Sequence, residues 1–577
     1  MKPLRVWAPK ATRLEVALNG QRYSLVREGG SHNWWRLEAV GIEEFDDYAL
    51  FVDGQGPFPD PRSRWQPRGV HGPSRMESAA NFAWSDHGFR PRPLAQGLIY
   101  ELHIGTFTPA GTFSAAIERL DHLAALGVTH VELMPLAEFS GARGWGYDGV
   151  DLFAPHHHYG TPAELKALID QCHRRGLAVL LDVVYNHFGP SGNYLPRFAP
   201  YLTDRYSTPW GEAVNVDGPG SDQVRRFFCD NACYWLAEYH FDGLRLDAVH
   251  AIIDSSPLHL MEQLQREVAS LGDGRPRLLI EENDRNDPRG IMSPARGGYG
   301  LDAQWNDDFH HALHSVLTGE RSGYYSDFGS LSQLAKVLRA GYVYDGQYSP
   351  YRDRIQGRPA CGLSGNNFVG YLQNHDQVGN RAQGERSSQL MPLGRLKIGA
   401  ALVLTAPFVP MLFQGEEWGA STPFLYFSDH AEPDLARAVS EGRRREFAAF
   451  GWNPASVPDP QAAATFIRSK LRWEELAVSP HRELLQWYRA LIQLRSASAD
   501  LQDGRMSCVN VTYDEAQGWI VIQRGAIGVA VNLGSAPVRL PWPAPSRLLM
   551  GSTPAIRIAT DFLELPPDSV AISTNQP

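Results

Sequence analysis

The chain has 577 residues, which is more than one hydrophobic core usually serves, so two or three domains are expected. Its formal net charge is -10, from 54 basic and 64 acidic residues, and neither sign forms a long run. This balance argues against nucleic acid or an anionic membrane as a partner.

The first 90 residues have the pattern of a small β domain. Residues 4–8, 14–18 and 22–26 alternate between apolar and polar side chains, and Asn19-Gly20 supplies a tight hairpin turn. A segment rich in proline and arginine, 57–93, follows as a linker. The start of the chain lacks an apolar stretch of signal-peptide length, and five scattered cysteines favour free thiols over disulfides. We therefore expect a cytoplasmic protein.

From residue 97 onward the pattern changes to strands that alternate with helices. Each expected strand is a short apolar run, and the eight runs are 98–102, 128–133, 177–184, 244–248, 277–280, 301–305, 368–372 and 409–413. Helical spacing covers 114–126, 222–239 and 482–494, and Thr161-Pro162-Ala163-Glu164 has the signature of a helix start. Eight strands separated by helices predict an α/β fold, a (β/α)8 TIM barrel.

After about residue 500 the alternation returns to a period of two. The segments 519–523, 528–532 and 570–572 are expected strands of a second small β domain. We therefore expect three domains: an N-terminal β-sandwich with its linker over 1–90, a catalytic barrel over 91–499, and a C-terminal β domain over 500–577. The early Val6-Trp7-Ala8-Pro9 and the alternation after it resemble an immunoglobulin-like domain, which implies that the N-terminal β-sandwich is of this type.

Polar residues follow five of the predicted barrel strands. In a TIM barrel the working residues lie where the strands end, so these residues should meet at one mouth. The five groups are 146–148, 182–187, Arg245 with Asp247, 281–284 and 374–376. Five groups of polar residues at one mouth are hard to explain by a role in stability alone.

The pair Arg245 and Asp247 gives the first indication of chemistry. Side chains two residues apart on a strand point the same way, and a neighbouring cation keeps a carboxylate ionised. Taken alone, the pair is as well explained by a structural ion pair. A glutamate at the end of the next strand would bring two carboxyl groups to about 5 Å, the separation of a retaining glycosidase.

Four of these motifs resemble the conserved regions of the α-amylase clan, glycoside hydrolase family thirteen. They are 182–187, 243–250, 280–284 and 374–376, in the order and spacing of that family. The resemblance implies that Asp247 is the nucleophile, Glu282 the general acid/base, and Asp376 the carboxylate that fixes the sugar. It also implies that the same sugar site is lined by Tyr147, His187, Arg245 and His375.

Glu281 departs from the family pattern, which usually has a small residue at that position. Alternation along the strand lets only one of Glu281 and Glu282 point into the mouth. We favour Glu282 as the acid.

Within the clan, three segments resemble the maltooligosyltrehalose trehalohydrolases. They are 100–107, 247–250 and 375–381. The resemblance implies hydrolysis of the α-1,4 bond next to the terminal trehalose of an α-glucan oligosaccharide, in a pathway with an enzyme that forms this substrate. The alternatives are a branching enzyme, a debranching isoamylase-type enzyme, and a non-catalytic glucan-binding relative. To distinguish trehalose, polar groups must face its second ring, and the candidates are His250, Gln377 and Arg381.

Two further motifs are expected to be structural or to line the substrate. His156-His157-His158 suggests a metal site, but consecutive residues of an extended loop should point apart. Glu416 and Glu417 follow the last barrel strand, where acids either contact glucan or stabilise the start of a helix. We expect catalysis to require no metal ion and no organic cofactor.

Overall fold

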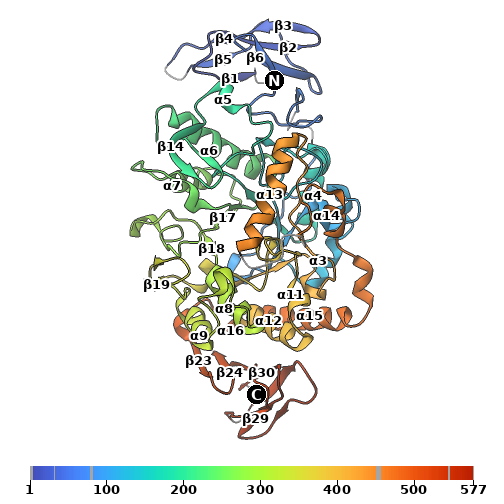
Figure 1. Ribbon diagram of the computed structural model, residues 1–577, viewed down its shortest axis with the longest axis vertical. Coiled ribbons are helices and arrows are strands. Elements are labelled where there is room, and N and C mark those ends of the chain that lie inside the picture. The colour runs from blue at the N-terminus through green and yellow to red at the C-terminus, as the bar shows by residue number, and fades with distance from the viewer. Residues whose placement is uncertain (1–3, 31–32, 78–81, 450–456, 544–545, 576–577) are drawn as a thin grey trace.

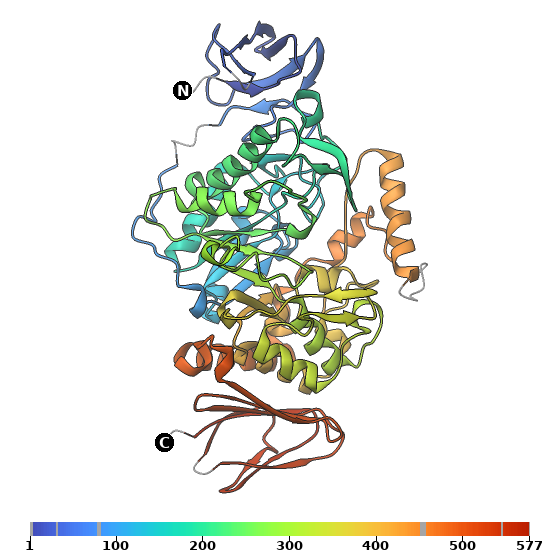
Figure 2. The ribbon, with the colours of Figure 1, turned by 90° about the vertical axis from the view of Figure 1, so that its left-hand side faces the viewer.

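The computed structural model describes residues 4–30, 33–77, 82–449, 457–543 and 546–575. The molecule is elongated, with β structure at each end and a helical and barrel body between them (Figure 1). A view turned by 90° shows the same three-part arrangement, with the N-terminal and C-terminal strands at opposite ends (Figure 2). Residues 78–81 of the expected linker lie outside the described residues.

The body contains a closed barrel of eight parallel strands, as the sequence predicts. The last strand pairs with the first, with Met411 opposite Ile99, and this closes the barrel. The strands in barrel order are β9 (Ile99–Leu102), β10 (His130–Leu133), β13 (Ala178–Val183), β16 (Gly243–Leu246), β17 (Leu278–Glu281), β18 (Ala303–Trp305), β21 (Phe368–Tyr371) and β22 (Val409–Phe413).

The interior of the barrel changes from apolar to charged along the strands. Ile99, Leu180 and Ile280 belong to one buried apolar cluster that fills it. Two residues further along each of these strands lie Glu101, Asp182 and Glu282. Because side chains alternate, these acids face the same way as the apolar residues below them. The mouth therefore has a polar lining over an apolar floor.

Three of the long helices, Pro162–Arg174, Ser221–Glu238 and His481–Ala497, agree with predicted helices. The helix α4 (Pro162–Arg174) begins with the expected capping box between Thr161 and Glu164. The other main helices of the body are α6 (Ser221–Glu238), α7 (Leu260–Ala269), α8 (Asp307–Thr318), α9 (Leu331–Ala340), α12 (Leu393–Thr405), α13 (Pro433–Ala449) and α15 (His481–Ala497). Shorter ones are α1 (Ile104–Phe107), α5 (Leu195–Phe198), α10 (His375–Gly379), α11 (Ser387–Leu390), α14 (Ala463–Arg468) and α16 (Ala499–Gln502).

The helix expected over 114–126 is two helices in the structure. They are α2 (Phe113–Ile117) and α3 (Leu120–Leu126), and the break lies at Arg119. The Arg119 guanidinium lies 4.7 Å from the centre of the Trp473 ring, a contact with a segment far away in the sequence. The predicted stop at Gly127 is correct, with φ at 97°.

Three hairpins extend from the barrel in loops where no strand was predicted. They are β11 (Ala137–Glu138) with β12 (Asp151–Pro155), β14 (Leu202–Thr208) with β15 (Gly211–Val214), and β19 (Gln347–Ser349) with β20 (Arg354–Gln356). The first follows β10 and carries Tyr147 in the loop between its strands.

The N-terminal part forms two antiparallel sheets, ordered β1-β5-β4 and β3-β2-β6-β7, with β8 paired to β6. Asn19 and Gly20 form the predicted turn, both with positive φ. The strands are β1 (Arg5–Trp7), β2 (Leu14–Leu18), β3 (Gln21–Ser24), β4 (Val26–Arg27), β5 (Trp34–Arg36), β6 (Asp47–Val52), β7 (Gln55–Phe58) and β8 (Ser74–Arg75).

A buried histidine ties the linker to the barrel. His173 on α4 holds Asp86 of the linker at 2.9 Å through Nδ1 and Asp242, which precedes β16, at 2.9 Å through Nε2.

The C-terminal part forms a sheet ordered β23-β24-β25-β30-β27 and a smaller one ordered β26-β29-β28. The three predicted segments there are strands. The bounds are β23 (Val509–Asp514), β24 (Trp519–Arg524), β25 (Ile527–Asn532), β26 (Val538–Pro541), β27 (Arg547–Gly551), β28 (Arg557–Ile558), β29 (Phe562–Leu565) and β30 (Ser569–Thr574).

Two buried arginines lie where this part meets the barrel. Arg524 donates to the carbonyl oxygens of Thr405 at 2.8 Å and Ala406 at 2.7 Å, at the end of α12. Arg495 of α15 donates to the carbonyl oxygen of Ala406 as well, at 3.0 Å.

Across the described residues, no helix combines the length and apolar character that spanning a bilayer requires.

Candidate active site

Arg245 lies at the centre of the barrel mouth and joins three carboxylates. Its Nη1 lies 2.8 Å from Asp247 Oδ1 and 2.8 Å from Asp182 Oδ2, and its Nη2 lies 2.7 Å from Glu282 Oε2. The three acids come from the neighbouring strands β13, β16 and β17 or from the residue that follows the strand. The guanidinium also lies 4.2 Å from the centre of the Trp305 ring, and its side chain is fully buried.

Asp247 is held ionised by its neighbours. Burial alone would raise its pKa, but Arg245, His187 and the Asn186 side chain together lower the pKa below its usual value. Asn186 Nδ2 donates to Asp247 Oδ2 at 2.6 Å. The predicted pairing of Arg245 with Asp247 is confirmed. A charged carboxylate of this kind is able to act as a nucleophile.

Glu282 and Glu281 face different surroundings. The pKa of Glu282 is raised well above its usual value by burial and by Asp247 and Asp376, although Arg245 opposes the shift. The backbone N–H of Ala248 donates to Glu282 Oε2 at 2.9 Å. The carboxyl group of Glu281 instead packs against Gly290. The contact is so close that a Cβ atom added to Gly290 would lie 1.9 Å from Glu281 Oε1. Only Glu282 therefore contacts Arg245.

A second group of residues borders the mouth from the ends of other strands. Tyr147 donates its hydroxyl to Asp182 Oδ2 at 2.6 Å and lies 2.8 Å from His375 Nε2. Asp376 lies beside His375. Its Oδ2 is 3.5 Å from His375 Nε2, and its side chain is one-third exposed. Tyr147, His375 and Asp376 are thus brought together, as the sequence predicts.

Glu101 on β9 is a member of the site that the sequence reasoning missed. It accepts a hydrogen bond from the His375 backbone N–H at 3.0 Å, and its other oxygen pairs with His375 Nδ1. Burial lowers the pKa of His375, but Asp376 and Glu101 more than compensate and raise it to about 9. His375 is therefore held as an imidazolium. Its partner is 274 residues away, so no local motif could identify it.

Trp210 is a second missed residue. It lies at the turn of the β14–β15 hairpin, and its ring stacks on His187 with centroids 4.6 Å apart and planes 4° apart. His187 Nδ1 in turn pairs with Asn186 Oδ1, next to Asp247. Trp210 is 48% exposed, so one aromatic face beside the mouth remains open to solvent.

The three specificity candidates have different partners. His250 Nε2 lies 3.6 Å from Asp284, which also pairs with Arg352 from the loop of the β19–β20 hairpin. Gln377 accepts a hydrogen bond from the Tyr325 hydroxyl at 3.4 Å. The Arg381 guanidinium is bound to Glu320 at 2.8 Å and is mostly buried.

Glu416 and Glu417 are buried against other parts of the barrel. Glu417 accepts hydrogen bonds from the Tyr100 hydroxyl at 3.2 Å, and Glu416 accepts one from the Tyr488 hydroxyl at 3.0 Å. These contacts favour the structural interpretation of the two acids.

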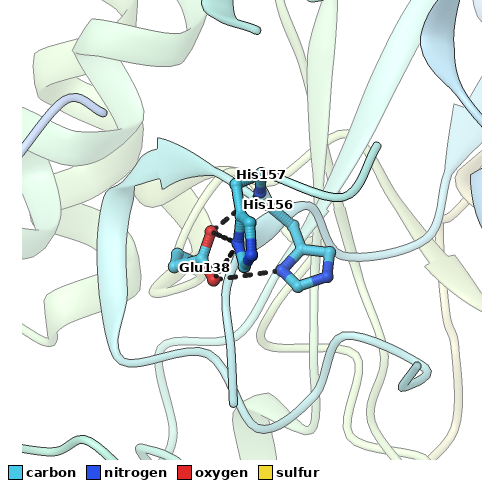
Figure 3. A group of neighbouring side chains, drawn as sticks. All are labelled: Glu138, His156 and His157. Carbon is cyan, nitrogen blue, oxygen red and sulfur yellow. Dashed lines mark hydrogen bonds and ion pairs between the residues drawn. The ribbon is translucent and has the colours of Figure 1, made fainter. Parts of the chain in front are cut away.

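The expectation that neighbouring histidines of 156–158 point apart is wrong for two of them. His156 and His157 both turn back toward Glu138, the last residue of β11 (Figure 3). A turn directly after β12 reverses the chain and brings both rings to the same carboxylate. Among the described residues, this is the one cluster of at least three His, Cys, Asp or Glu side chains placed to hold a metal ion.

The comparisons with known proteins agree with this geometry. The family described as Alpha amylase, catalytic domain, matches residues 75–204, and a domain of unknown function, DUF3459, matches 504–572. A malto-oligosyltrehalose trehalohydrolase of Arthrobacter ramosus is 51% identical over 93% of this chain and 93% of its own length. A second one, from Rhizobium sp. (strain M-11), is 46% identical over 98% of this chain and 96% of its own length.

A solved structure supports the fold over the whole chain. The crystal structure of a "putative alpha amylase" from Salmonella typhimurium superposes with a TM-score of 0.92 at 39% identity, covering 100% of this chain and 97% of the other. A barrel mouth with paired carboxylates on one arginine, together with relatives of this identity and coverage, shows that the chain belongs to the malto-oligosyltrehalose trehalohydrolase family of the α-amylase clan.

Proposed function

We propose that the protein hydrolyses the α-1,4-glucosidic bond next to the terminal trehalose of a maltooligosyltrehalose, releasing trehalose and a maltooligosaccharide. The observation that carries the proposal is the guanidinium of Arg245, which binds both an ionised Asp247 and a Glu282 whose pKa is raised. Two carboxyl groups in opposite protonation states are the acid and nucleophile that a retaining glycosidase needs.

In the first step Asp247 attacks the anomeric carbon of the sugar on the non-reducing side of the bond. Glu282 gives its proton to the departing glycosidic oxygen, so that trehalose leaves neutral while a glycosyl ester forms on Asp247. Asp376, Tyr147 and His375 line the same mouth and are assigned to hold the sugar ring.

In the second step a water molecule replaces trehalose. Glu282, now ionised, takes a proton from the water as its oxygen attacks the anomeric carbon, and the ester bond to Asp247 breaks. Asp247 is restored as a carboxylate and Glu282 as an acid. Arg245 stays in contact with both throughout and stabilises whichever of them carries the negative charge.

We assign recognition of the trehalose end to His250 and Gln377. Both lie near a catalytic residue in the chain, His250 three residues after Asp247 and Gln377 directly after Asp376. His250 Nδ1 has no hydrogen-bond partner among the described residues, and Gln377 accepts from Tyr325 through its side-chain oxygen, which leaves its amide N–H groups to donate to a sugar hydroxyl. Arg381, whose charge is paired with Glu320, is assigned to hold the 375–381 loop in place and to border the same sugar.

The test compares maltotriosyltrehalose with maltopentaose, which have the same number of glucose units. The proposal predicts trehalose and maltotriose from the first substrate and much slower cleavage of the second. Equal cleavage of both would indicate an amylase, and inertness toward both would favour a branching or debranching enzyme. A Glu282→Gln preparation, purified in the same way, controls for a contaminating hydrolase.

The wider setting follows from the same proposal. We propose the division 1–90, 91–499 and 500–577 for the N-terminal β domain with its linker, the barrel and the C-terminal β domain. The substrate must come from an enzyme that forms a trehalose unit at the end of a maltooligosaccharide. All five cysteines are free thiols, which supports a reducing, cytoplasmic setting.

A further inference from the structure

The hairpin that carries Tyr147 holds a cluster of donor atoms with no part in the proposed reaction. Glu138 ends β11, and His156 and His157 directly follow β12. His156 Nδ1 lies 3.2 Å from Glu138 Oε1, while His157 Nδ1 lies 2.9 Å from Oε1 and 3.0 Å from Oε2. Figure 3 shows both rings turned toward the same carboxylate.

These separations fit the edges of a small coordination sphere. A tetrahedral zinc ion with ligands at about 2.0–2.1 Å has its ligand atoms about 3.3 Å apart. One ligand atom from each of the three residues lies within 4.8 Å of the other two. The distances from Glu138 Oε1 to His156 Nδ1, 3.2 Å, and to His157 Nδ1, 2.9 Å, are close to the separation of about 3.3 Å between the ligand atoms of a tetrahedral zinc ion. Two imidazole nitrogens and one carboxylate oxygen are a donor set that zinc and similar divalent ions prefer.

Burial and charge around the cluster favour a cation. The side chains of Glu138 and His156 are fully buried, whereas His157 is 21% exposed. Asp151, the strand partner of Glu138, is a second buried acid, and its Oδ2 has no hydrogen-bond partner among the described residues.

The rings are also held in place by packing. His156 stacks on Phe139 with centroids 3.7 Å apart and planes 14° apart. The His157 side chain is 21% exposed, so this side of the cluster borders solvent. The cluster is therefore rigid on one side and open on the other.

We propose that Glu138, His156 and His157 form a structural binding site for one divalent transition-metal ion of the zinc type. Each imidazole binds the ion through Nδ1, and its remaining proton then lies on Nε2. The ion replaces the hydrogen bonds that link both rings to Glu138. It joins the last residue of β11 to the segment that follows β12, and so fixes the hairpin whose loop places Tyr147 in the mouth. This proposal stands independently of the proposed function.

The experiment starts with the full chain stripped of metal by a chelator and dialysed. Zinc is then titrated in competition with a chromophoric chelator, and the thermal unfolding midpoint is measured with and without zinc. The proposal predicts one zinc ion per chain, a higher unfolding midpoint with zinc, and an X-ray absorption spectrum with nitrogen and oxygen ligands at about 2.0–2.1 Å.

Two histidine variants provide a matched comparison. His157→Gln removes a partly exposed ligand, so the fold should survive, and zinc affinity should fall at least about tenfold. His158→Gln changes the exposed neighbour, which is outside the cluster, and should bind zinc as the unmodified chain does.

The proposal is overturned if the unmodified chain binds no stoichiometric zinc, or if both variants bind it equally. In either case the cluster is only a carboxylate that accepts hydrogen bonds from two imidazoles. If His157→Gln does not fold, the stoichiometry and absorption spectrum of the unmodified chain still decide the question.

Discussion

Buried arginines serve two different purposes in this protein. Arg245 at the barrel mouth faces three carboxylates, whereas Arg495 and Arg524 below the barrel face backbone carbonyl oxygens. Burial lowers the pKa of all three. The carboxylates reverse this for Arg245 and raise its pKa well above the usual value, while the pKa of Arg495 falls to about 9 and that of Arg524 to about 10.

The contrast shows how the partners of a buried charge decide its role. Arg245 lowers the pKa of both Asp247 and Glu282, so changing it should alter the chemistry first. The two lower arginines satisfy carbonyl groups at the end of α12 and at the junction with the C-terminal sheet, so changing them should alter stability first. If the two roles are separate, variants at the mouth should lose activity and variants below the barrel should lose stability.

The largest effect is expected for Glu282→Gln. The amide cannot give a proton to the leaving oxygen, so kcat should fall by about 1,000-fold or more while the unfolding midpoint stays the same. Steady-state kinetics and thermal unfolding measure the two quantities. Glu281→Gln is the matched control and should retain its activity; if it were the inactive variant, the assignment of the acid would be reversed.

The next largest effect is expected for Arg245→Lys. One ammonium cannot reach three carboxylates, and kcat/KM should fall by about 100-fold, which corresponds to about 2.7 kcal/mol. Because Arg245 lowers the pKa of both Asp247 and Glu282, both pKa values should rise in the variant. The pH profile of kcat/KM should therefore move to higher pH on both limbs. An unchanged profile would show that Arg245 does not set these pKa values.

A smaller effect, on stability alone, is expected for Arg524→Met. Its loss leaves the carbonyl oxygens of Thr405 and Ala406 without this donor, so the free energy of unfolding should fall by about 2 kcal/mol. Urea unfolding measures this change, and kcat at 25 °C should be unaffected. Arg539→Met changes an exposed arginine of the same part of the chain and should cost less than about 0.5 kcal/mol.

The smallest effect concerns the pH dependence of stability through His173. Burial lowers the pKa of His173, but Asp242 and Asp86 outweigh it and raise the pKa above its usual value. The stabilisation from the charged ring is therefore complete below the unfolded pKa of about 6.5 and is lost as the pH rises through the folded pKa. The free energy of unfolding should be lower at pH 9 than at pH 6, and this decrease should be smaller in His173→Gln than in the unmodified protein. Equal losses in both proteins would contradict this role.

Local sequence was enough to predict the barrel because each strand carries its own signal. The segment 409–413, for example, is a continuous apolar run, and it coincides with β22 (Val409–Phe413). At the break that was not predicted, Arg119 contacts Trp473, a residue far away in the sequence that no pattern within one helix includes. The three loop hairpins were missed because most of their strands carry no clear apolar signal: β11 has two residues, and β14, β19 and β20 are largely polar and exposed.

The candidate site likewise contains contacts that the sequence could predict and contacts that it could not. Arg245 and Asp247 could be paired from the sequence because they are two residues apart on one strand. The contacts of Glu101 with His375 and of Trp210 with His187 join different strands and loops, so spacing gave no sign of them. His156 and His157 were misjudged because the turn after β12, and not the strand pattern, sets the direction of their rings.

The closure of the barrel has a consequence for how the enzyme is made on the ribosome. The first strand, β9, pairs on one side with β10 and on the other with β22, more than 300 residues later in the chain. The same first strand carries Glu101, which holds His375. A nascent chain that has not yet exposed β22 has an open sheet edge, so the pocket is completed only late in translation. Activity therefore cannot arise before the last barrel strand, β22, has been synthesised and has paired with β9.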